Sequence, residues 1–304
     1  MTEDYPRMLL ELEQRFGDEA KCRDSLFALR WPQGFICPVC GAGGVAIRRD
    51  LWRCGQCGRE TSVMAGTIFQ DRKLPLTIWF RAMWQVTSQK NGVSALGLQR
   101  VLGLGNYKTA WARLHKLRRA MVRPGRDRLS GVVEVDEAYW GAEQSGVRGR
   151  QSVDKALISV AAPADGKGIG RIRLRHIADT SRATLHGFIG QSIEPASTVV
   201  SDGLQAYRER EGCLHERQIQ KHQPADAEHL LPRVPRVISR FKRWLLGTHQ
   251  GAVAHEYLQD YLDEFTFRCN RRKSASRGKL FYRLAQQAVE VSPVPFDLLP
   301  HHKL

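Results

Sequence analysis

Two apolar runs that each lead into an aspartate decide the expected fold: residues 132–137 (VVEVDE) and residues 199–203 (VVSDG). Valine dominates both runs, as is typical of buried strands. Strands are expected at residues 131–136, 156–162, 171–178 and 197–202. Helices are expected at residues 181–190, at 204–211 and in two stretches after Pro235. This order of elements predicts an α/β domain in which a mixed sheet is flanked by helices.

The two aspartates suggest a metal site. Asp136 and Asp202 meet if their strands are neighbours in the sheet. Paired carboxylates repel each other unless a divalent cation lies between them, and Mg²⁺ prefers such oxygen ligands. Two metal ions can activate a water or a 3′-hydroxyl and stabilise the leaving oxygen of a phosphodiester. Asp136 and Asp202 are therefore predicted to be catalytic ligands of Mg²⁺ or Mn²⁺. The alternative for either residue alone is that it caps a turn or a following helix.

Four of the seven cysteines form two CxxC pairs, Cys37 with Cys40 and Cys54 with Cys57, and a glycine follows each pair. Two such knuckles complete a tetrahedral Zn²⁺ site, and because all four positions are filled the zinc is expected to be structural. Four unligated cysteines or a redox pair are the alternatives, but the spacing and the glycines favour zinc.

The charge of the chain points to a polyanionic partner. Its 304 residues carry a net charge of +16, and 42% hydrophobic and 26% charged residues exclude wholesale disorder. Residues 1–130 hold 22 Lys and Arg against 11 Asp and Glu, so the front of the chain is expected to face DNA. No apolar run of about 18 residues predicts a membrane span, and the N-terminus does not look like a secretory signal.

Residues 93–103 and 106–121, joined by Gly-Leu-Gly, fit a helix-turn-helix. The second helix carries a basic set that is expected to contact phosphates and base edges: Lys108, Arg113, Lys116, Arg118 and Arg119. The alternative is an amphipathic hairpin with a solvated basic face. Arg271 and Arg272 lie in a later basic run that either holds DNA phosphates or is a solvated loop.

The expected domain organisation has five parts. They are an N-terminal helical segment (1–30), a zinc ribbon (31–62), a helical DNA-binding region with the helix-turn-helix (75–123), a catalytic domain (130–285) and a tail (291–304).

Several longer motifs point to a family. They are residues 29–35 (LRWPQGF), 107–111 (YKTAW), 135–141 (VDEAYWG), 201–203 (SDG), 242–249 (KRWLLGTH), 261–268 (YLDEFTFR) and 270–272 (NRR). With these motifs the chain resembles, over roughly residues 15–290, bacterial insertion-sequence transposases of the DDE superfamily with an N-terminal zinc ribbon. The resemblance implies a ribonuclease-H-like core, Asp136 and Asp202 as the first two metal ligands, and Lys242 as the basic residue that follows the third.

The third ligand is where the chain departs from the family pattern. In the family an acidic or polar ligand stands seven residues before the lysine, on the same helix face. Here that residue is Pro235, which has no side-chain ligand atom. Either the site has two protein ligands, or Glu228 or His229 substitutes, or the copy is inactive.

The resemblance implies a DNA transposase that binds the terminal inverted repeats of an insertion sequence. It would cleave the 3′ ends and join them to target DNA, as a homo-oligomer on DNA in the bacterial cytoplasm, associated with the nucleoid. Pro235 favours an alternative, an inactive or repurposed transposase that only binds DNA. A ribbon-bearing transcription regulator of unrelated ancestry is a third interpretation, but the paired aspartates and the C-terminal motifs oppose it.

Overall fold

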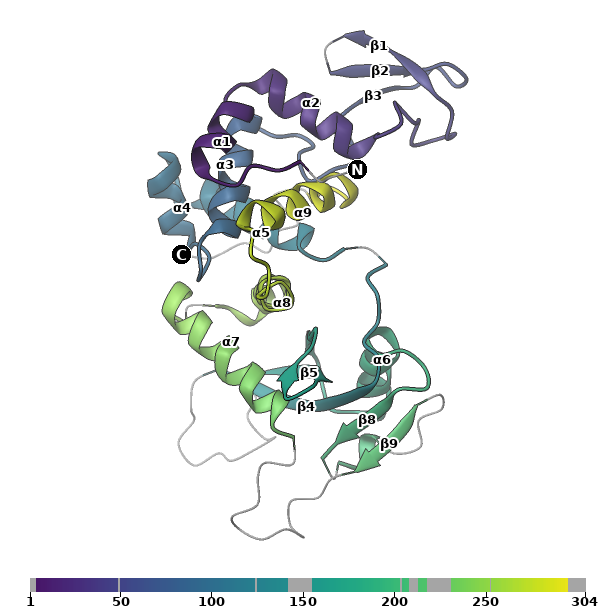
Figure 1. Ribbon diagram of the computed structural model, residues 1–304, viewed down its shortest axis with the longest axis vertical. Helices are drawn as coiled ribbons and strands as arrows, with labels where there is room; N and C mark the ends of the chain where they lie inside the picture. The colour runs from purple at the N-terminus through teal and green to yellow at the C-terminus, as the bar shows by residue number, and fades with distance from the viewer. Residues whose placement is uncertain are drawn as a thin grey trace. The chain divides into compact units, whose positions relative to one another are not determined.

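The computed structural model describes residues 4–48, 50–123, 125–141, 155–202, 204–207, 213–217, 231–251 and 253–294. The chain divides into two compact units. Met1–Gly125 and Lys273–Leu304 form the first unit, and Arg126–Arg272 form the second. Along the sequence, the second unit is therefore inserted between two segments of the first, which carry the purple-to-blue and the yellow colours in Figure 1.

The first unit combines helices with a small antiparallel sheet of order β1-β2-β3. Its elements are α1 (Leu9–Arg15), α2 (Glu19–Arg30), β1 (Gly44–Arg48), β2 (Leu51–Cys54), β3 (Glu60–Ser62), α3 (Leu76–Ser88), α4 (Ala95–Leu102), α5 (Tyr107–Ala120) and α9 (Arg277–Glu290). The predicted helical hairpin is present as α4 and α5. Ser94 and Asn106 cap the two helices through their side chains, and Gly103 ends α4 with a φ of 63°. No helix in the described part of the chain is long and apolar enough to cross a membrane.

The C-terminal helix α9 lies with the first unit and not with the inserted one. It packs against α2, α3 and α5, and Phe281 contacts Phe80 and Trp84 with ring centroids 5.9 Å apart in each pair. The catalytic domain expected from the sequence extended to residue 285, whereas the compact inserted unit ends at Arg272. The apolar stripe of an amphipathic helix does not identify the core against which the helix packs, so the sequence pattern did not indicate that α9 belongs to the first unit. Residues 295–304 of the expected tail lie outside the described residues.

The second unit is built on a six-stranded mixed sheet. Its elements are β4 (Val132–Trp140), β5 (Ala156–Asp165), β6 (Gly168–Ile169), β7 (Arg173–Ile177), α6 (Arg182–Ser192), β8 (Thr198–Ser201), the 3₁₀ helix η2 (Gln205–Tyr207), β9 (Leu214–Arg217), α7 (Arg233–His249), η4 (His255–Tyr257) and α8 (Leu258–Asn270). The main strand order is β7-β5-β4-β8-β9, with β4, β5 and β7 antiparallel and β8 and β9 parallel to β4. The predicted mixed sheet flanked by helices is confirmed.

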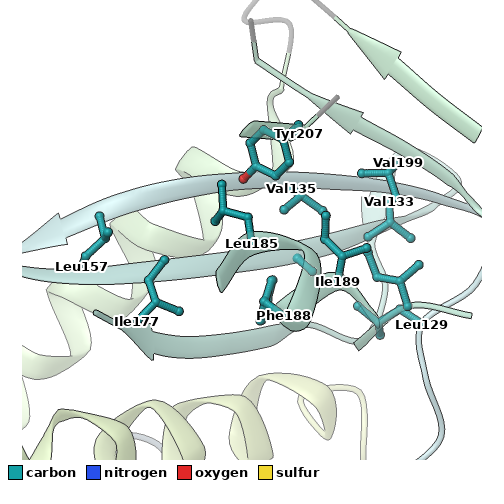
Figure 2. Close-up of a cluster of buried hydrophobic side chains, with 12 residues drawn as sticks. Leu129, Val133, Val135, Leu157, Ile177, Leu185, Phe188, Ile189, Val199 and Tyr207 are labelled. Atoms are coloured by element: carbon teal, nitrogen blue, oxygen red, sulfur yellow. The ribbon is translucent and has the colours of Figure 1, made fainter. Parts of the chain in front are cut away.

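Helices cover both faces of this sheet. Figure 2 shows Val133 and Val135 of β4 beside Leu185, Phe188 and Ile189 of α6, in one buried apolar cluster. Residues of β4 between these valines point the other way, because side chains alternate along a strand. On that second face α7 packs against β4 and β5, and α8 packs against β7.

The strand that carries Asp136 is longer than the sequence predicted. β4 continues to Trp140, which pairs with Ala156 of β5. Asp136 therefore lies within β4 and not at its end. It does lie beyond the parallel pairing with β8, whose last pair is Glu134 with Val200. Of the helix expected at 204–211, the structure describes a short 3₁₀ helix over Gln205–Tyr207.

Candidate functional site

The four paired cysteines form one compact cluster. All four Sγ atoms lie within 4.8 Å of one another, with Cys37 Sγ 3.7 Å from Cys57 Sγ and Cys40 Sγ 3.4 Å from Cys54 Sγ. Four thiolates arranged tetrahedrally at a Zn–S distance of about 2.3 Å lie about 3.8 Å apart. The cluster thus has the donor set and the spacing of a structural zinc site.

Backbone geometry prepares the knuckles for metal. Gly41 and Gly58 have φ values of 75° and 67°, a region that favours glycine, which accounts for glycine after each CxxC pair. The N–H groups of Cys57 and Gln56 donate to the Cys54 sulfur at 3.5 and 3.4 Å. These backbone hydrogen bonds lower the pKa of the Cys54 thiol to about 6. A thiol with a lowered pKa readily supplies the thiolate that zinc requires.

Aromatic packing ties the ribbon to α2. The ring of Trp52 on β2 stacks on Phe27 of α2, with centroids 4.7 Å apart, and lies 5.7 Å from the ring of Trp31. The Arg30 guanidinium donates to the carbonyl oxygens of Ser62 and Val63 at 3.2 and 2.8 Å. The zinc ribbon therefore packs against α2 as part of the first unit and is not a separate domain.

Asp136 lies on β4, and Asp202 directly follows β8, the adjacent parallel strand. Each is two residues past the last β4–β8 pair, so Asp136 and Asp202 leave the pairing at the same level of the sheet. Asp136 Oδ1 accepts the N–H of Glu137 at 2.8 Å, and Asp202 Oδ1 accepts the N–H of Leu204 at 2.9 Å. These bonds orient both carboxylates from their own backbone.

Tyr207 links the 3₁₀ helix η2 to β4, a contact that the sequence patterns did not indicate. Its buried hydroxyl donates to Glu137 Oε1, across from η2 to β4. Burial, followed by the charges of Glu137, Asp136 and Asp202, raises the pKa of Tyr207 well above its ordinary value. The hydroxyl thus links η2, which follows Asp202, to the residue that follows Asp136 on β4. In the sequence, the position of Glu137 directly after Asp136 in the VDEAYWG motif was the one sign of a further acid near the site.

The helix α7 carries the two positions expected to complete the site. Pro235 lies in its first turn and Lys242 two turns later, and both are exposed. Glu228 and His229 lie outside the described residues. Among the residues that are described, the cysteine cluster is the one group of three or more Cys, His, Asp or Glu side chains close enough to share a metal ion. Asp136 and Asp202 offer two carboxylates, the donor type that Mg²⁺ and Mn²⁺ prefer. Within the described residues they form no group of three ligands.

The helix α5 is less accessible than a recognition helix should be. Lys108 is exposed, and Arg113, Lys116 and Arg119 are half-buried. Burial lowers the pKa of Arg113 and of Lys116. Arg118 is 1% exposed, which disagrees with the expectation that it contacts DNA. The basic side chains lie on the same helix as a wide apolar stripe. The spacing of apolar residues along α5 therefore could not show which basic side chains point inward.

Arg271 and Arg272 at the end of α8 make internal contacts. The Arg271 guanidinium lies 3.9 Å from the centroid of the Phe267 ring. Arg272 donates to the carbonyl oxygens of Cys269, at 2.8 Å, and of Ile169. Arg272 thus ties the end of α8 to β6, a structural role that the sequence did not suggest.

Comparisons with known proteins agree with this architecture. Residues 128–270 match the model of the ISXO2-like transposase domain, and residues 17–60 match the transposase zinc-ribbon domain. The chain is 28% identical over 214 residues to "Uncharacterized protein in transposable element ISH50" of Halobacterium salinarum, covering 63% of this chain and 70% of the relative. That relative is archaeal, so the bacterial origin expected from the sequence is not shown.

A solved structure of the simian T-cell lymphotropic virus intasome in complex with PP2A regulatory subunit B56 gamma also matches. Its identity is 13% and its TM-score 0.31, over 62% of this chain and 65% of that one. A superposition this loose supports no argument about function.

Proposed function

Because the chain belongs to the ISXO2-like DDE transposases with an N-terminal zinc ribbon, we propose that it is the DNA transposase of an insertion sequence. It binds the terminal inverted repeats of its element, cleaves the 3′ ends and joins them to target DNA. The observation that carries the proposal is the pairing of β4 with β8, which brings Asp136 and Asp202 to the same level of the sheet.

Asp136 and Asp202 hold divalent metal in this proposal. When bound, Mg²⁺ or Mn²⁺ supplies charge stabilisation at the phosphodiester and lowers the pKa of an attacking hydroxyl. In the first step water attacks the phosphorus, the bond to the 3′ oxygen breaks, and that oxygen leaves as a free 3′-hydroxyl. In the second step this hydroxyl attacks a target phosphodiester and displaces the target's own 3′ oxygen. The exposed ammonium of Lys242 holds a phosphate of the bound strand.

The first unit supplies DNA binding in this proposal. Its ribbon and helical hairpin carry the basic excess of the front of the chain. Lys108, Arg113, Lys116 and Arg119 remain proposed contacts, whereas the burial of Arg118 leaves it a packing role. Arg271 and Arg272 contact phosphate in this proposal only through the guanidinium N–H groups that do not already donate to the carbonyl oxygens of Phe267, Cys269 and Ile169. The protein acts as a homo-oligomer on DNA, in the cytoplasm with the chromosome.

Pro235 favours a second function for this copy, DNA binding without chemistry. The position expected for the third ligand is exposed on the first turn of α7 and offers no ligand atom. Such a protein would still occupy repeat ends, because phosphate contacts do not require the metal site.

A strand-cleavage assay separates the two functions. Labelled duplexes covering the ends of the DNA that flanks the gene are incubated with the purified chain and Mg²⁺ or Mn²⁺. An active transposase leaves free 3′-hydroxyls at the element ends and joined products with target DNA, and Asp136→Asn and Asp202→Asn abolish both. Tight binding without any cleavage by the unaltered chain indicates the DNA-binding function, and absence of both activities refutes the proposal.

A further inference from the structure

A second carboxylate on β4 has an unusual set of partners. Glu134 has a side chain 3% exposed, far below an ordinary surface glutamate. Its Oε2 accepts the backbone N–H groups of Arg233 at 2.7 Å and Val234 at 3.2 Å. Its Oε1 accepts the Arg233 guanidinium at 2.5 Å. A buried acid from the sheet thus binds the first turn of α7, one hundred residues later.

These bonds account for the whole N-terminus of α7. An α-helix begins with four backbone donor positions that have no partner inside the helix. Here they belong to Pro232, Arg233, Val234 and Pro235. The two prolines have no N–H, and Glu134 accepts the other two donors. The negative carboxylate also lies at the positive end of the helix dipole.

We propose that Glu134 is a positioning residue for the metal site. Its carboxylate fixes the first turn of α7 on β4, and thereby sets where the side chain at position 235 lies relative to Asp136. Glu134 and Asp136 are two residues apart on one strand and so share a face of the sheet. Position 235 directly follows Val234, whose N–H Glu134 holds. The inference rests on the proposed metal role of Asp136 and Asp202.

The same contacts explain why proline is accepted at the third-ligand position. Proline in a first helical turn breaks no intrahelical hydrogen bond. The turn is held by Glu134 whatever residue stands at 235. In this proposal the backbone of the turn keeps its place when another residue replaces Pro235, and a carboxylate introduced at 235 adds a ligand to the site.

The test measures Mn²⁺ affinity and amide exchange in the zinc-loaded 304-residue chain without DNA. Four variants are compared: Pro235→Glu alone, and Pro235→Glu combined with Glu134→Gln, with Glu134→Asp or with Glu264→Gln. Glu264 is the matched control, a carboxylate with a side chain 1% exposed that is paired with Arg268 at 2.9 Å within α8. Glu134→Asp keeps the charge and shortens its reach by one methylene, so a folded variant is at hand if Glu134→Gln fails to fold.

We expect Pro235→Glu to bind Mn²⁺ at least about tenfold more tightly than the unaltered chain, because it adds a carboxylate ligand and even the loss of a supporting residue costs about tenfold or more in metal affinity. Glu134→Gln and Glu134→Asp remove most of this gain, and Glu264→Gln keeps it. Amides at the start of α7 exchange faster in both Glu134 variants and remain protected in the Glu264 variant.

Each contrary result has its own meaning. Unchanged exchange at the start of α7 overturns the role of Glu134 and leaves the proposed function intact. Faster exchange with an undiminished Mn²⁺ gain reduces Glu134 to a purely structural residue and also overturns the proposal. No gain from Pro235→Glu in any background, with faster exchange in the Glu134 variants, overturns the metal role of position 235 and with it the positioning role.

Discussion

Substitution of Gly278 by alanine tests the assignment of α9 to the first unit. A Cβ at this position overlaps the carbonyl oxygen of Pro6, and it lies 2.8 Å from the Pro6 carbonyl carbon and 3.0 Å from the Tyr5 ring. Gly278 has ordinary helical φ, so alanine would otherwise stabilise the helix by about 1 kcal/mol. Overpacking against backbone costs about 1–3 kcal/mol, and the overlap with an oxygen that cannot rotate away puts this site at the upper end. The expected net loss is about 1–2 kcal/mol of the free energy of unfolding.

Gly187 provides the matched control. It lies inside α6, where an added Cβ meets no atom within 4 Å. Gly187→Ala should therefore stabilise the inserted unit by up to about 1 kcal/mol. Both variants are followed by urea unfolding with far-ultraviolet circular dichroism, and amide exchange assigns each change to a unit. If Gly278→Ala proves as stable as the unaltered chain, with unchanged exchange in residues 5–16, the described packing of α9 on the N-terminal segment is refuted.

Three further outcomes are expected. The purified chain carries about one zinc ion. Cys54→Ser releases the zinc and loosens the ribbon together with its aromatic packing on α2, while the inserted unit stays folded. Elemental analysis that finds no zinc in the folded protein would contradict this. Tyr207→Phe removes the donor to Glu137 and lowers the free energy of unfolding of the inserted unit by about 1–3 kcal/mol, measured by urea titration; an unchanged midpoint would show that the hydroxyl is dispensable. The affinity for repeat DNA falls steeply with salt, with a log–log slope of about −0.9 for each phosphate contact, and Lys108→Ala reduces the slope by about one; a flat salt profile would exclude phosphate-dominated binding.

The zinc cluster and the sheet were predictable from the sequence for a physical reason. Zinc ligands come from two short knuckles whose spacing is written in the chain, and the glycines at positive φ mark the turns. The apolar runs ending in Asp136 and Asp202 likewise indicate strands, and the structure pairs these strands in parallel.

Long-range partners were not predictable in this way. The pattern around Glu134 gives no sign that this acid binds α7, because its partners Arg233 and Val234 are 99 and 100 residues away. The period of α5 shows its core stripe but not that Arg118 is buried with it. The apolar stripe of α9 does not show that the helix packs in the first unit, where it lies against α2, α3 and α5 and where Gly278 approaches Pro6 closely.

Binding of Mn²⁺ to the aspartate pair tests the central claim most directly, since it requires no knowledge of the repeat sequence. Electron paramagnetic resonance titrations of the zinc-loaded chain are compared with those of Asp136→Asn, Asp202→Asn and, as a control, the exposed Asp179→Asn. The account predicts a Mn²⁺ site that either of the first two substitutions weakens strongly and that Asp179→Asn leaves intact. Equal Mn²⁺ binding by the unaltered chain and by both Asp136→Asn and Asp202→Asn would contradict it.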